Sequence, residues 1–154
     1  MRASDKIRYK INTATVTEKL IAIIVLVFLF FGILNTVFSL FKISGFTAFY
    51  DWFVLPSDPA EFILKPWTII SYSFLHGGIW HLASNMLILY FSGIYFLNFF
   101  SPKRLLNYYF LGVIIGGLVF MLSYNLFPAF SGGKSYLVGA SAGVMAVLIG
   151  VATQ

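Results

Sequence analysis

Residues 20–41 read LIAIIVLVFLFFGILNTVFSLF and contain no charged side chain. A helix that crosses a bilayer needs about 20 mainly apolar residues, and this segment provides them. A secretory signal peptide would have a shorter apolar region that ends in a small-residue cleavage site, and neither feature is present. The segment is therefore predicted to be an uncleaved first membrane span.

Three more apolar segments follow and extend the pattern. They cover residues 79–100, 105–126 and 137–154, and the last is at the short end of the spanning range. The expected fold is an all-α, polytopic transmembrane helical bundle with about four spans in this chain. Residues 1–19 form a basic N-terminal segment, and residues 20–154 form one membrane domain.

The composition excludes several other classes of protein. Of the 154 residues, 60% are apolar and only 10% are charged, whereas a soluble domain has about 25% charged residues. A soluble domain and a disordered tail are excluded by these proportions, and a disulfide scaffold by the lack of cysteine. The net charge is +5, but no basic stripe with interleaved aromatic residues accompanies it, so no nucleic-acid partner is expected.

The distribution of lysine and arginine predicts the orientation in the membrane. A cytoplasmic N-terminus places seven of these residues on the cytoplasmic side and three outside. The seven are Arg2, Lys6, Arg8, Lys10, Lys19, Lys103 and Arg104, and the three are Lys42, Lys65 and Lys134. The long connection over residues 42–65 then lies outside, and its tryptophan and tyrosine residues favour the membrane interface. A basic N-terminus without transit features favours a bacterial inner membrane.

Polar residues inside a membrane are costly and are candidates for function. His81 and Asn85 are four residues apart and share one face of the expected second span. His76 precedes two glycines and is expected in the loop before that span, where it would hydrogen-bond backbone. Ser141 lies near the start of the fourth span. Because the second and fourth spans run in the same direction, these polar groups are expected at a similar depth, near the outer face.

The spacing His76-x4-His81-x3-Asn85, followed by Gly139-x-Ser141, resembles that of the rhomboid family of intramembrane serine proteases. The resemblance implies that Ser141 is the nucleophile. It implies that His81 and Asn85 are side-chain donors of an oxyanion hole, together with the Ser141 N–H. His76 would be a structural histidine, and Gly139 would remove bulk beside the nucleophile. No metal and no organic cofactor is implied.

Two features depart from the family pattern. Ala142 follows the serine where the family usually has glycine, and one methyl group there would narrow the contact with a neighbouring helix. The family takes its catalytic histidine from a later helix, and no histidine follows Ser141 in this sequence.

Two hypotheses therefore stay open. The chain is the N-terminal portion of a protease that cleaves single-span membrane proteins near the outer face of the lipid bilayer. Alternatively, it is a catalytically inactive rhomboid-like protein that binds transmembrane helices.

Other functions fit less well. Residues 139–143 also read Gly-x-Ser-x-Gly, but a soluble serine hydrolase needs a strand before the serine and an aspartate and a histidine after it. Two histidines without cysteine or a nearby carboxylate form a poor metal site. A small transporter or a structural membrane protein would leave the spacing of the histidines and Asn85 to chance.

Overall fold

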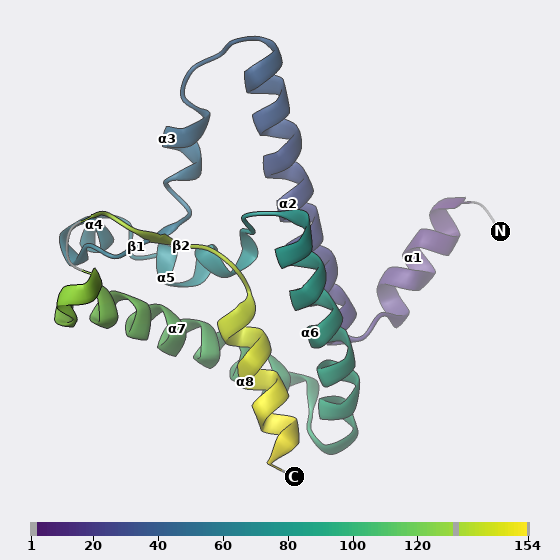
Figure 1. Ribbon diagram of the computed structural model, residues 1–154. Coiled ribbons are helices and arrows are strands. Elements are labelled where there is room, and N and C mark those ends of the chain that lie inside the picture. Colours follow the sequence, from purple (N-terminus) through teal and green to yellow (C-terminus); the bar gives the residue numbers. More distant parts are fainter. Residues whose placement is uncertain (1–2, 131–132, 154) are drawn as a thin grey trace.

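The computed structural model describes residues 3–130 and 133–153 (Figure 1). The described α-helices are α1 (Ala3–Thr13), α2 (Val16–Leu40), α3 (Phe46–Tyr50), α4 (Pro59–Leu64), α5 (Thr68–Ser71), α6 (Ile79–Phe99), α7 (Pro102–Leu126) and α8 (Ser141–Ala152). Two short 3-10 helices, η1 (Tyr72–Phe74) and η2 (Pro128–Phe130), and two short strands, β1 (Leu55–Pro56) and β2 (Tyr136–Leu137), complete the described part of the chain.

Three helices are long and apolar enough to cross a membrane. These are α2 and α7, with 25 residues each, and α6, with 21. Large apolar side chains point away from the protein along them; Leu26 is 64% exposed and Leu111 is 57% exposed. Such surfaces are stable in lipid and unstable in water. The predicted all-α, polytopic membrane fold is confirmed.

The first helices differ in their bounds from the sequence prediction. Helix α2 begins at Val16, four residues before the expected start at residue 20, because Thr15 and Glu18 form a capping box. The Glu18 carboxylate accepts from the Thr15 N–H at 2.7 Å, and the Glu18 N–H donates to the Thr15 hydroxyl at 3.2 Å. The basic segment 1–19 is therefore divided between α1 and the first turn of α2. Arg2 lies outside the described residues.

The fourth apolar segment is shorter as a helix than expected. The prediction started it at residue 137, but α8 begins at Ser141 and has 12 residues. Tyr136 and Leu137 form β2, which pairs antiparallel with β1, with Leu55 opposite Leu137. A residue held in a strand cannot also be the first turn of a helix. Gln154, the last residue of the predicted span, lies outside the described residues.

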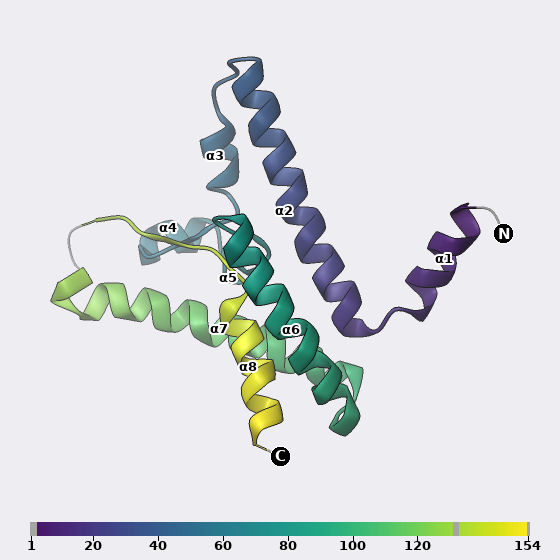
Figure 2. The same ribbon diagram turned by 45° about the vertical axis from the view of Figure 1, so that its right-hand side comes forward.

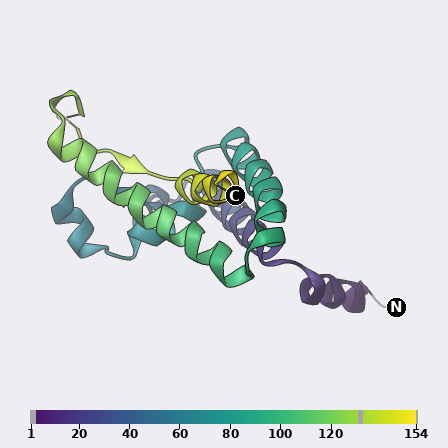
Figure 3. The ribbon, with the colours of Figure 1, turned by 90° about the horizontal axis from the view of Figure 1, so that it is seen from below.

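Helices α6 and α8 run in the same direction, and α7 crosses them steeply (Figures 1 and 2). Seen from below, α7 lies across the bundle while α1 projects away from it (Figure 3). The shared core is made of fully buried side chains from several elements, among them Tyr72, Phe96, Tyr109, Val113, Val144 and Val147. Small residues on α7 and α8 allow these two helices to approach closely.

Residues 41–78 connect α2 to α6 and contain the short elements α3, β1, α4, α5 and η1. The indoles of Trp52 and Trp67 stack with centroids 5.8 Å apart, and the Trp67 Nε1–H donates to the Trp52 carbonyl at 2.8 Å. Ile63 and Leu64 are each 73% exposed. An exposed apolar and indole-rich surface is typical of a segment at the membrane interface.

Candidate active site

Ser141 is the first residue of α8, and its side chain is exposed. The first N–H groups of a helix have no partner within the helix and form its positive end. The first backbone hydrogen bond of α8 runs from the Val144 N–H to the Ala140 carbonyl at 3.0 Å, and no side chain caps this end of the helix. The hydroxyl of Ser141 therefore lies beside N–H groups that are directed out of the helix end and could stabilise an anion.

His76 lies in the loop between η1 and α6 and is 7% exposed. Its Nε2 accepts from the backbone N–H of Ala140, the residue before Ser141, at 3.4 Å. His76 was expected to hydrogen-bond backbone at the entry to the second span, but the backbone that it binds belongs to the segment that leads into Ser141. His76 Nδ1 is buried and has no hydrogen-bond partner among the described residues. The pKa of His76 is lowered to about 4, mainly by burial and to a smaller extent by the nearby His81, while the backbone of Phe74 acts in the opposite direction.

His81 and Gly139 are in direct contact. Gly139 has φ +126°, a conformation that residues with a side chain rarely adopt, and a Cβ atom there would lie 2.6 Å from His81 Cε1. The ring of His81 also packs edge-on against His76, with centroids 5.1 Å apart. The space beside Gly139 is filled by the ring of His81.

Asn85 is buried one turn after His81 on α6. Its Nδ2 donates to the His81 carbonyl at 2.9 Å and lies 3.4 Å from His76 Nε2. The single lone pair of that nitrogen also accepts from the Ala140 N–H, so the second amide hydrogen of Asn85 at most shares this acceptor. Donation from Asn85 to an oxyanion would require the longer of these two contacts to be given up.

The structure thus brings His76, His81, Asn85 and Gly139 into one connected cluster. Ser141 is joined to this cluster through its two preceding residues. Within the described residues, no hydrogen bond joins the Ser141 hydroxyl to either histidine or to Asn85, and no group of three metal-ligating side chains is present.

The segment before Ser141 is fixed by contacts that the sequence did not predict. The Ser57 N–H donates to the Ser135 carbonyl at 2.8 Å, and the Ser135 N–H donates to the Ser57 hydroxyl at 3.1 Å. Two residues after the β1–β2 pair, the Gly139 N–H donates to the Tyr72 carbonyl at 3.0 Å. Together with the bond from Ala140 to His76, these contacts bind residues 135–140 to the segment 55–76.

Tyr72 also connects this segment to α7. Its hydroxyl donates to the Val113 carbonyl at 2.7 Å, and the side chain is almost completely buried. Burial raises the pKa of Tyr72 to about 12, so the hydroxyl remains a donor at neutral pH. The pairing of β1 with β2 could not be predicted locally, because the sequence showed only that Leu55 and Leu137 are apolar.

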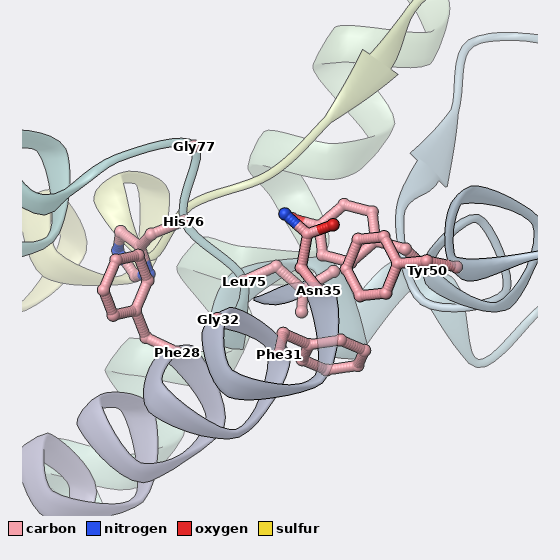
Figure 4. Close-up of a pocket in the computed structure, with 9 residues that line it drawn as sticks. Phe28, Phe31, Gly32, Asn35, Tyr50, Leu75, His76 and Gly77 are labelled. Carbon is pink, nitrogen blue, oxygen red and sulfur yellow. The ribbon is translucent and has the colours of Figure 1, made fainter. Parts of the chain in front are cut away.

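A pocket of about 230 Å³ opens beside His76, between α2, α3 and the loop before α6 (Figure 4). Aromatic side chains, including Phe28, Phe31 and Tyr50, form much of its wall, and Asn35 of α2 adds an amide. The pocket places open space next to the histidine that holds the approach to Ser141.

These features define a multi-pass helical membrane protein in which a serine begins a short helix beside two histidines and an asparagine. Residues 64–154 match the family model described as the Rhomboid domain. The chain belongs to the rhomboid family.

One curated relative illustrates the range of this family. The chain is 37% identical over 82 residues to "Inactive RHOMBOID-like protein 8" of Arabidopsis thaliana. The match covers 52% of this chain and 23% of that relative, so the chain spans less than a quarter of its length. No solved structure matches the chain.

Proposed function

We propose that this chain carries the nucleophile and the oxyanion-binding part of an intramembrane serine endopeptidase. The observation that supports this most is the fixed approach to Ser141: Ala140 bonds to His76, and Gly139 packs against His81. A serine held at a helix end beside polar donors is suited to acyl transfer, because the tetrahedral intermediate needs preorganised hydrogen-bond donors.

In this proposal the Ser141 hydroxyl attacks the peptide carbonyl of a single-span membrane protein. The Ser141 N–H, the His81 side chain and Asn85 then stabilise the oxyanion. A serine hydroxyl needs a base to take its proton. His76 is an unsuitable base because its Nε2 already accepts from Ala140 and because burial lowers its pKa. We assign the base to a histidine outside residues 1–154, in keeping with the family resemblance.

The location belongs to the same proposal. Seven of the ten lysine and arginine residues lie at sequence positions 2–19 and 103–104, which favours a cytoplasmic N-terminus in a bacterial inner membrane. Ser141 then lies toward the outer face, and cleavage would occur there.

A second function is favoured by one comparison. The Arabidopsis thaliana relative is named as inactive, and a rhomboid-like protein without a base could bind transmembrane helices without cleaving them. Such a protein would have the same fold and would not need Ser141 as a nucleophile.

The experiment that separates the two functions is labelling of the full-length protein in membranes with a fluorophosphonate, together with cleavage of a single-span test substrate. The protease proposal expects labelling and cleavage in the parent and neither in Ser141→Ala. Binding of the test substrate without labelling or cleavage in the parent would instead support the inactive relative.

A further inference from the structure

Residue 142 is an alanine at a crowded place in the fold. Its methyl group faces Gly116 of α7 so closely that a Cβ atom at position 116 would lie 2.5 Å from the Ala142 Cβ. Real Cβ atoms do not approach to this distance, and neither methyl group could rotate away, because both are bonded directly to backbone. The missing side chain of Gly116 is therefore what admits the methyl group of Ala142.

The same two helices have a second close contact one turn away. Gly112 of α7 lies against Ala146, and a Cβ atom at position 112 would also lie 2.7 Å from the Ala142 carbonyl oxygen. Helices α7 and α8 thus meet through two glycine–alanine pairs, Gly112 with Ala146 and Gly116 with Ala142. The second pair is adjacent to Ser141.

We propose that Gly116 is a positioning residue for Ser141: it accommodates the methyl group of Ala142 and thereby keeps the start of α8 against His81 and His76. The importance of this position for catalysis rests on the proposed function, but the contact itself does not. A side chain at position 116 would push α8 away from α7 and shift the serine relative to α6.

The geometry also predicts how the defect can be repaired. If residue 142 were glycine, the nearest remaining atoms to a Cβ at position 116 would be the Tyr72 hydroxyl, at 3.6 Å, and the Cα of residue 142, at 3.8 Å. Both are ordinary van der Waals distances. Gly116→Ala combined with Ala142→Gly moves one methyl group from α8 to α7 and leaves the total volume unchanged.

Gly112 offers a matched control. In Gly112→Ala the new methyl group meets the Ala142 carbonyl oxygen, which is backbone and stays in place when residue 142 is glycine. Ala142→Gly should therefore rescue Gly116→Ala and fail to rescue Gly112→Ala.

The test measures thermal unfolding and the position of residue 141 in the full-length protein. The 154 residues contain no cysteine, so Ser141→Cys introduces one thiol within them, and its alkylation rate by iodoacetamide reports the surroundings of residue 141 without any need for catalysis. For a full-length protein with cysteines elsewhere, these are replaced by serine first. Turnover of the test substrate is measured in parallel in the Ser141 background.

We expect Gly116→Ala to lower the unfolding temperature by roughly 4–8 °C, the usual result of overpacking in a protein of this size. The thiol alkylation rate should change several-fold, and kcat/KM should fall by roughly 10²-fold, as for a misplacement of about 1 Å. Adding Ala142→Gly should return all three quantities to near their parent values.

Helix propensity alone predicts the opposite sign, because alanine is favoured over glycine inside a helix. A Gly116→Ala variant as stable as the parent, with unchanged alkylation, would overturn the inference. A double variant that unfolds or alkylates like the single variant, or that fails to fold, would also overturn it. If the parent shows no turnover while the melting and alkylation results behave as expected, the proposed protease function fails and the positioning by Gly116 stands.

Discussion

The ring of His81 occupies the space that a side chain at Gly139 would need, so that a Cβ atom at position 139 would lie 2.6 Å from His81 Cε1. This contact joins α6 to the last turn before α8. It ties the orientation of one expected oxyanion donor to the backbone that presents Ser141.

We expect Gly139→Ala to impair both folding and catalysis. The φ of +126° costs a residue with a side chain about 1–3 kcal/mol, and the new methyl group must also displace His81. The unfolding temperature and kcat/KM of the full-length protein measure the two effects. Gly45→Ala is the matched control, because Gly45 has φ +108° but no atom within 4 Å of its Cβ position. An equal loss in both variants would show that the contact with His81 contributes nothing.

Replacement of either expected oxyanion donor should slow turnover. His81→Ala and Asn85→Ala each remove one donor and should lower kcat by roughly 10²–10³-fold. Ser84→Ala serves as the control, because Ser84 also donates to the His81 carbonyl, at 3.1 Å, but is exposed on α6. Near-normal turnover in the Asn85 variant would show that Asn85 is not an oxyanion donor. Its role would then be structural, through its contacts with the His76 ring and the His81 carbonyl.

Stability should depend on pH through His76. Its pKa is about 4 in the folded protein and about 6.5 in an unfolded chain, so the unfolded state binds more protons between these values. The contribution of neutral His76 to the free energy of unfolding is complete above about pH 6.5 and is lost as the pH falls to 4. This contribution is of the order of 2 kcal/mol after allowance for partial solvent screening. Unfolding of the parent and of His76→Gln is compared from pH 4 to pH 7. Identical slopes in the two proteins would contradict the assignment.

Ser57→Ala should loosen the approach to Ser141. The variant removes the hydroxyl that accepts from the Ser135 N–H, and an unsatisfied, partly buried donor costs about 1–2 kcal/mol. We expect a lower unfolding temperature together with reduced turnover, because residues 135–140 lead directly to Ser141, the proposed nucleophile. Ser123→Ala, which loses a hydroxyl bonded only within α7, controls for the loss of a serine. A stability loss without any change in turnover would separate Ser57 from the site.

Much of the fold follows from local properties of the sequence. The apolar segments at residues 79–100 and 105–126 correspond to α6 (Ile79–Phe99) and α7 (Pro102–Leu126) within a few residues, because a backbone in lipid must satisfy its hydrogen bonds within the helix. The start of α2 was misplaced because its first turn is polar and is stabilised by the Thr15–Glu18 cap rather than by apolar character.

The features that the sequence did not reveal depend on contacts between distant segments. Leu137 was assigned to a helix on hydropathy alone, but its pairing with Leu55 places it in a strand. The spacing of His81 and Asn85 placed these two residues on one face of α6, but it could not show that the Asn85 amide lies beside His76 of the preceding loop. Ala142 correctly indicated close packing against a neighbouring helix. Its partner, Gly116 of α7, could not be identified from the sequence, because small residues occur throughout α7 and α8.

The bond between Ser135 and Ser57 joins residues that are 78 positions apart. Each long helix can form from its own neighbours as the chain enters the bilayer, whereas closing a loop of this length waits until both ends are present. Assembly therefore has an order, with α2, α6 and α7 inserted before the two strands meet. We therefore expect a newly made chain to hold Ser141 without the backbone contacts that align it, and to complete these contacts only after the surrounding helices are in place.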